Sequence, residues 1–152
     1  MSVLTAERSV SRKGANPDTG SVRVITVPLK TGAAVFKGGV VGIDNTTGYG
    51  VSGTGLQATT VIAVGIALKS VTNAGASGSV SVDVERGLWP LNILGGDTFG
   101  QAKMGQAVFL EDDQTVRATN GTSTRSAAGT CWGLDENGLA LVELGIRSAT
   151  GL

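Results

Sequence analysis

Histidine is absent from this chain of 152 residues, and cysteine occurs once, at Cys131. Without histidine, the chain lacks the commonest general base, the usual zinc ligand and the base of the usual nucleophilic triad. A single cysteine cannot form an internal disulfide, and beside Trp132 in an apolar segment we interpret it as a small buried hydrophobe. We therefore expect a protein that is not an enzyme and that uses no cofactor and no metal.

Long apolar runs and aromatic residues are also scarce. The longest apolar run, Val61 to Leu68, is too short to cross a membrane, and the N-terminus has no apolar core of a secretory signal. We therefore expect no membrane partner and synthesis in a cytosol. Basic residues are few and have no aromatic residues interleaved with them, so we expect no nucleic-acid partner. Two tryptophans, three phenylalanines and one tyrosine suggest a modest stability reserve, which favours association with identical copies or with a larger scaffold.

The chain has 24 glycines and only three prolines, with abundant Val, Thr and Ser, which is typical of an all-β protein with many turns. Its clearest strand signal is Ser79 to Leu91, where valines at 80, 82 and 84 alternate with polar residues. Arg86-Gly87 interrupts this alternation as a bulge would. Pro90 cannot donate to a central ladder, so the segment is predicted to run to an edge or rim.

Shorter apolar segments alternate with turn signals along the rest of the chain, and together they predict a sandwich or a small barrel. Asn137-Gly138 predicts a type I′ turn in the last hairpin, and residues 97–104 predict a helical turn. We expect a single β domain of about eight short strands (residues 21–145), an extended N-terminal arm (1–20) and a C-terminal tail (146–152). The other strands are predicted at 21–29, 33–43, 49–51 and 61–71, and in two hairpins, 107–110 with 115–118 and 130–134 with 139–144.

Three motifs could carry chemistry, but each is better interpreted as a turn. Gly48 to Gly53 matches the dinucleotide pattern G-x-G-x-x-G, yet no helix follows to hold a pyrophosphate, so a glycine-rich hairpin is favoured. Glu111-Asp112-Asp113 lacks the alternate ligand spacing of a calcium loop and is interpreted as a solvated turn. Asp135 to Gly138 receives the same interpretation.

Charge is unevenly distributed, although the net charge is zero. Residues 1–40 contain six bases and two acids, a net +4, and residues 41–152 contain six bases and ten acids, a net −4. Such asymmetry can mark an arm that binds an acidic surface, or simply a solvated tail. Arg8, Arg12 and Lys13 are the candidate residues for anchoring the arm by charge-assisted hydrogen bonds.

The order of these segments resembles that of the capsid cement, or decoration, proteins of tailed phages and Mu-like prophages. The likeness covers nearly the whole chain and is clearest towards its end. It is carried by residues 4–8 (LTAER), 39–44 (GVVGID), 61–67 (VIAVGIA), 82–87 (VDVERG), 108–116 (VFLEDDQTV) and 121–129 (GTSTRSAAG).

This resemblance implies a non-enzymatic virion protein that is made in the bacterial host's cytoplasm. It would sit on the outer surface of the head, commonly as a homotrimer, with the major capsid protein as its partner. In that hypothesis the arm extends over the shell or a neighbouring copy. Apolar residues at strand ends would form the contact between copies, with Trp89, Leu91 and Phe99 as candidates. The alternatives are a tail or head–tail connector component and, from the enzyme class, a small ligand-binding or hydrolase domain.

Overall fold

The computed structural model describes residues 3–10, 24–52, 60–97, 99–122 and 124–144. Within these ranges the chain is all-β, with twelve strands, no α-helix and one short 3-10 turn, η2 (Gln101–Lys103). The predicted fold class is therefore confirmed. The C-terminal tail expected at 146–152 and most of the predicted arm lie outside the described residues.

The first part of the β domain forms an open antiparallel sheet with the order β1-β7-β5-β3-β4. Pro28 lies in β1, which is an edge strand as its proline predicted. A small two-stranded sheet pairs β2 with β6. The strands of these two sheets are β1 (Val24–Pro28), β2 (Ala34–Val35), β3 (Val40–Asp44), β4 (Gly50–Ser52), β5 (Val61–Ala67), β6 (Val71–Thr72) and β7 (Ser81–Glu85).

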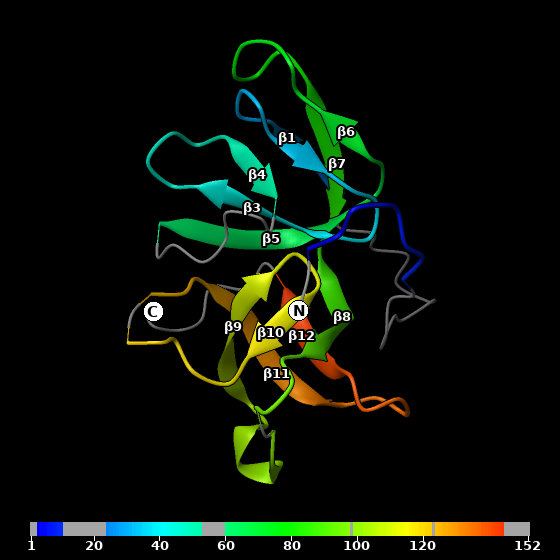
Figure 1. Ribbon diagram of the computed structural model, residues 1–152, viewed down its shortest axis with the longest axis vertical. Helices are drawn as coiled ribbons and strands as arrows, with labels where there is room; N and C mark the ends of the chain where they lie inside the picture. Colours follow the sequence, from blue (N-terminus) through cyan, green and yellow to red (C-terminus); the bar gives the residue numbers. More distant parts are fainter. Residues whose placement is uncertain (1–2, 11–23, 53–59, 98, 123, 145–152) are drawn as a thin grey trace.

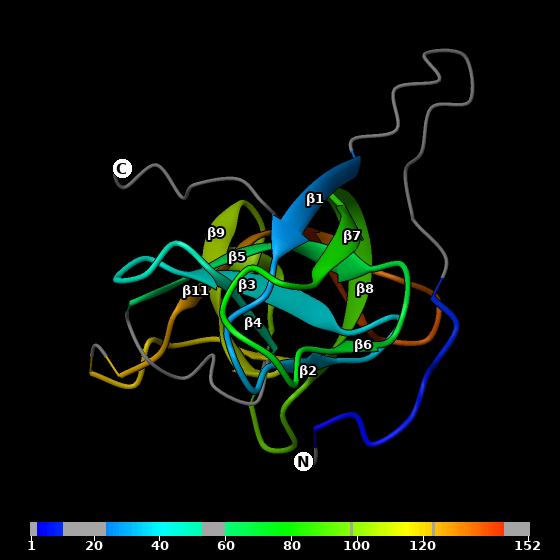
Figure 2. The same ribbon diagram turned by 90° about the horizontal axis from the view of Figure 1, so that it is seen from above.

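The second part forms a closed five-stranded barrel with the order β10-β8-β12-β11-β9, in which β9 pairs back to β10. All of its pairs are antiparallel except β8 with β10. Figure 1 shows the barrel beneath the open sheet, and Figure 2, seen from above, shows the sheet lying over the barrel strands. The barrel strands are β8 (Gly87–Ile93), β9 (Gln106–Asp112), β10 (Thr115–Arg117), β11 (Ala127–Leu134) and β12 (Ala140–Leu144).

Strand β5 lies between the two layers, which explains why its sequence is almost continuously apolar (Figure 1). Val61, Ala63 and Ile66 belong to the large core cluster that fills the barrel and the space above it. Val64 and Ala67 belong to a second cluster on the opposite face of the sheet. Apart from the exposed Ile62, the strand therefore buries both faces, and the large cluster is a core that the sheet and the barrel share.

The segment 79–91 divides between the two layers. Val82 and Val84 are buried while Ser81 and Asp83 are exposed, which confirms the predicted alternation in β7. At Gly87, where φ is +144°, the chain leaves the sheet and enters the barrel as β8. Strand β8 pairs with β12 over residues 87–91, and its pairing with β10 begins only at Asn92, beyond the proline. Pro90 therefore lies where β8 has one paired neighbour, as its missing N–H predicted, although the strand goes on to close the barrel.

The two predicted hairpins are confirmed, but the last turn differs in type. Gly138 has φ +78°, whereas Asn137 is not among the described non-glycine residues with positive φ. A type I′ turn would need positive φ at both positions, so the turn is the longer loop with glycine in the left-handed region. The Asp135 carboxylate stabilises it by accepting the backbone N–H groups of Asn137 and Leu139, both at 2.9 Å.

The twelve strands exceed the predicted eight or so, because single predicted segments bend into two. Residues 61–71 become β5 and β6, and residues 79–91 become β7 and β8. The motif at 48–53 enters β4, which pairs with β3 as the hairpin interpretation predicted. Gly53 lies outside the described residues.

Candidate functional site

Residues 3–10 lie against the body of the domain, and we call this segment the strap. The Leu4 backbone N–H donates to Asp113 Oδ1 (2.9 Å), in the turn between β9 and β10 of the barrel. The backbone N–H of Arg8 donates to the Lys37 carbonyl (3.1 Å) and its Nε to the Gly38 carbonyl (3.1 Å), both in the loop between β2 and β3. The strap therefore bridges the upper layers and the barrel. The structure thus places this part of the predicted arm on its own domain, whereas the hypothesis extended the arm over the shell or a neighbouring copy.

Two glycines shape the surface under the strap. A Cβ at Gly38, where φ is +88°, would lie 2.6 Å from the Arg8 carbonyl oxygen and 2.7 Å from Arg8 Cγ. A Cβ at Gly39 would lie 3.0 Å from both Asp113 Oδ2 and Leu4 Cδ1. Distances this short leave no room for a side chain at Gly38 and little at Gly39. The strap and the loop beneath it are in close steric contact.

Charges beneath the strap are partly withdrawn from water. Asp112 and Asp113 are buried, with 4% and 2% of their surface exposed, and Arg8 is half-buried. Burial raises the pKa of Asp113, the Leu4 N–H lowers it, the charge of Asp112 raises it and Arg8 lowers it. Burial lowers the pKa of Arg8, while Asp113 and Asp112 raise it. The acidic pair and the arginine therefore offset part of one another's desolvation cost.

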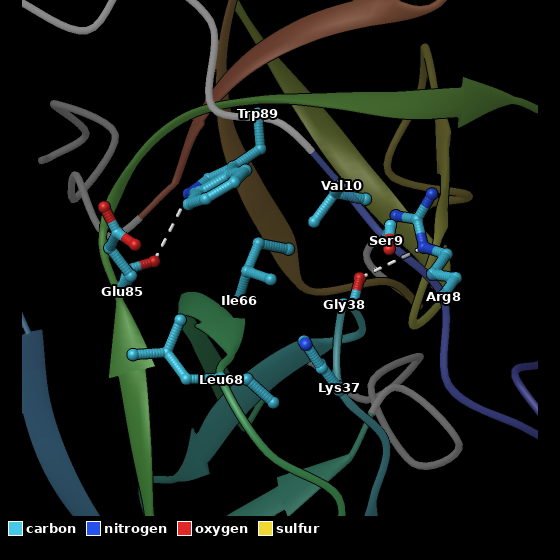
Figure 3. Close-up of a pocket in the computed structure, with 10 residues that line it drawn as sticks. Arg8, Ser9, Val10, Lys37, Gly38, Ile66, Leu68, Glu85 and Trp89 are labelled. Carbon is cyan, nitrogen blue, oxygen red and sulfur yellow. Dashed lines mark hydrogen bonds between the residues drawn. The ribbon is translucent and has the colours of Figure 1, made fainter.

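A hollow of about 200 Å³ lies beside the end of the strap (Figure 3). Ile66, Leu68 and Trp89 supply apolar lining, and Val10 of the strap packs against the core cluster at the same place. The Trp89 indole N–H donates to the Glu85 carbonyl at 3.2 Å, which fixes the ring at the wall (Figure 3). The hollow is therefore bordered on one side by the strap and on the other by apolar side chains of β5 and β8.

The three residues predicted to form the contact between copies are in the core instead. Trp89, Leu91 and Phe99 are 4%, 0% and 8% exposed, and all belong to the large core cluster. Trp89 and Leu91 pack in this cluster from alternate positions of β8 and so serve the stability of the single chain. The assignment of these side chains to an interface between copies is therefore corrected. Closure of the barrel, which covers β8, is the physical reason.

The three predicted basic anchors are divided by the structure. Arg8 binds the chain's own β2–β3 loop and faces its own acidic turn, so its guanidinium is not presented to a partner in this arrangement. Arg12 and Lys13 lie outside the described residues. Their role as anchors on another surface stays a prediction.

The acidic turn was predicted to be solvated, which is wrong for two of its three acids. Asp113 is held beneath the strap, and its carbonyl also accepts the Val40 N–H at 2.7 Å. Glu111 pairs with Arg117 (3.2 Å) and Arg125 (3.6 Å). Among the described residues, no group of three or more acidic, cysteine or histidine side chains is arranged to hold a metal.

Trp132 is an exposed tryptophan that was not predicted from the sequence to be a surface residue. It lies at a bulge of β11, where the register with β12 shifts between Cys131 and Gly133, and 58% of its surface is exposed. Its indole N–H donates to Glu143 Oε1 at 2.7 Å, so the ring is held in place. Cys131 is fully buried as predicted. Alternation along the strand, which sends the neighbour of a buried residue outward, was the signal that could have identified Trp132.

Beside Trp132, the outward face of β12 carries Leu141 and Glu143, and Leu88 of β8 lies opposite Glu143. Leu88 and Leu141 are half-buried. We call this surface the barrel patch, and it consists of Leu88, Trp132, Leu141 and Glu143. Contiguous exposed apolar surface with a rigid tryptophan is typical of a protein-binding site.

These features describe binding surfaces: a peptide bound over two glycines and an apolar patch around an oriented tryptophan. The described part of the chain contains no helix that could cross a bilayer. Comparison with protein-family profiles, with curated proteins and with solved structures gave no match to this chain.

Proposed function

We propose that this protein is a capsid decoration, or cement, protein that binds the outer surface of a phage head as trimers and stabilises the lattice of the major capsid protein. The order of sequence segments 4–8, 39–44, 61–67, 82–87, 108–116 and 121–129 suggests this function. The all-β fold agrees with it, since a closed barrel and a sheet with a shared core make a rigid block. The protein would act by bridging capsid subunits and would transform no molecule.

The observation that carries the proposal furthest is the barrel patch. Trp132 is exposed, yet a bulge and a hydrogen bond to Glu143 hold its ring in one orientation. Holding a large apolar ring in water has no benefit for the isolated chain, whereas a rigid aromatic residue loses little entropy on binding. We assign this patch to the contact with the capsid shell. Arg12 and Lys13 remain proposed as additional contacts from the arm.

The proposal is tested with heads assembled from the major capsid protein of the phage or prophage that encodes this chain. Trp132→Ala should weaken binding to undecorated heads by about 30-fold or more, because an interface tryptophan contributes about 2 kcal/mol or more. Ile62→Ala is the matched control, since Ile62 is also an exposed apolar residue (43%) but lies on β5, in the other layer. Binding is measured by co-sedimentation over a protein titration.

Equal binding by the two variants would contradict the assignment of the barrel patch. If the unmodified protein did not bind to undecorated heads, the proposed decoration function would be contradicted. Stoichiometry on purified particles separates the structural alternatives, since a decoration protein repeats with the capsid lattice and a connector forms a single ring. Light scattering of the free protein tests the proposed trimer.

A further inference from the structure

The strap and the surface beneath it have the relationship of a peptide ligand and its receptor. Leu4, Arg8 and Val10 make the contacts, while Thr5, Ala6, Glu7 and Ser9 are exposed. The receiving surface, which we call the groove, is built from later parts of the chain. It consists of Lys37, Gly38, Gly39, the hollow beside Trp89, and Asp113. Apart from the side of the hollow that Arg8, Ser9 and Val10 themselves line, the groove is formed by residues outside the strap.

The groove fits this segment specifically. It supplies two backbone carbonyls to Arg8, one buried carboxylate oxygen to the Leu4 N–H, and an apolar wall to Val10. At Gly38 the strap passes so close that even a methyl group would overlap it. The side-chain contacts are those of Arg8 and Val10, and the backbone N–H groups of Leu4 and Arg8 add two more anchors.

The connection between the strap and β1 is long enough to serve another copy of the protein. Residues 11–23 separate Val10 from Val24. The fourteen Cα-to-Cα steps between these two residues can span up to about 50 Å. A compact domain of this size has a radius of gyration of about 15 Å, so the connection can exceed the diameter of the domain. Chain length therefore does not restrict the strap to its own groove.

We propose that the groove binds the same segment of a second copy of this chain, so that straps are exchanged between neighbouring molecules. The few anchors make release of the strap feasible, and an identical groove on the neighbour offers identical contacts in return. Exchange would link copies that are already close together, without creating any new type of contact. The proposal concerns the purified protein and does not depend on binding to a capsid.

The experiment uses two isotopic forms of the full chain. The heavy form is labelled with ¹⁵N and carries Glu7→p-benzoylphenylalanine at an exposed strap position; the light form has the natural residue. After mixing and equilibration, irradiation links the strap to whichever groove it occupies, and mass spectrometry of the digested peptides identifies that groove as heavy or light. We expect links from the heavy strap to the light groove, and their fraction of all strap-to-groove links should rise with protein concentration. This fraction should become substantial near 1 mM, because a short tether gives the chain's own strap an effective concentration of about that size.

Two acceptor variants of the light chain distinguish the groove from non-specific contact. Gly38→Ala should lower the heavy-to-light share severalfold, because its methyl group would overlap Arg8. Gly32→Ala is the matched control: Gly32 also has positive φ (+77°), but a Cβ added there would have nothing within 4 Å. In the heavy chain, Arg8→Glu should remove the specific links.

Exclusively heavy-to-heavy links at every concentration would overturn the proposal. So would heavy-to-light links that are unchanged by Gly38→Ala and by Arg8→Glu. Because no capsid is present, either result leaves the test of capsid binding unaffected.

Discussion

Replacing Leu91 by alanine tests whether this side chain stabilises the single chain or a contact between copies. Leu91 is fully buried in the large core cluster, and it faces Ala140 across the β8–β12 pair. Buried leucine-to-alanine replacements cost about 2–5 kcal/mol, and the cost rises with the size of the cavity that remains. Closure of the barrel limits how far the neighbouring strands can collapse into that cavity. We therefore expect a loss in the upper part of the range, about 3–5 kcal/mol.

The assay is urea unfolding followed by tryptophan fluorescence and circular dichroism at two protein concentrations tenfold apart. With a denaturant dependence of about 2 kcal/mol per molar urea, the midpoint should fall by about 2 M. If the loss belongs to the single chain, the shift is the same at both concentrations. Leu134→Ala is the control: with 45% of Leu134 exposed, the variant should change stability by no more than about 0.5 kcal/mol.

A loss below about 1 kcal/mol for Leu91→Ala would refute the placement of this residue in a well-packed core. The placement would also be refuted if Leu91→Ala changed the oligomeric mass but left the unfolding free energy of the monomer unchanged. That outcome would restore the interface role that the sequence suggested.

Two further predictions concern strand β5 and the turn that follows Asp44. Gly65→Ala should destabilise the protein by about 1–3 kcal/mol in urea unfolding, since its Cβ would lie 2.4 Å from the carbonyl oxygen of Glu85; Gly133→Ala, with open space around it, should not. A Gly65→Ala variant as stable as Gly133→Ala would contradict the packing of β5. The Thr46 hydroxyl and N–H and the Lys30 ammonium lower the pKa of Asp44 from 3.8 to about 2. The ionised form is therefore favoured by folding, and its contribution, present above pH 4, should be lost as the pH falls from about 4 to about 2. The difference in unfolding free energy between the natural protein and Asp44→Asn should therefore shrink as the pH falls through that window. A difference that stays constant would contradict the lowered pKa of Asp44.

Local sequence patterns were sufficient to predict the strands, the hairpins and the edge position of β1. The alternation in 81–85 places Val82 and Val84 inside, and Asn137-Gly138 marks a true turn. Both follow from interactions between residues close in sequence, so no knowledge of distant partners was required. The turn type was missed because Asp135, two residues earlier, supplies the stabilising carboxylate.

The sites required distant partners and could not be read from local patterns. Trp89 is buried because β12 pairs beside it and distant residues of the core cluster, among them Ile66, pack with it. Asp113 is buried because the strap, more than 100 residues earlier, lies over it. In each case the local sequence predicts an exposed residue, and a segment distant in the sequence buries it.

The sequence by itself determined that this chain is built of β-strands, where the turns of its hairpins lie and which strand faces can be buried. The period of a strand and the preferences of glycine act over a few residues, so both can be recognised locally. Tertiary structure alone decided that the strands form a sheet above a closed barrel. It also decided that the strap binds its own domain, and that Trp132 rather than Trp89 remains accessible. Burial is a property of what covers a residue, and the covering segments here lie far along the chain.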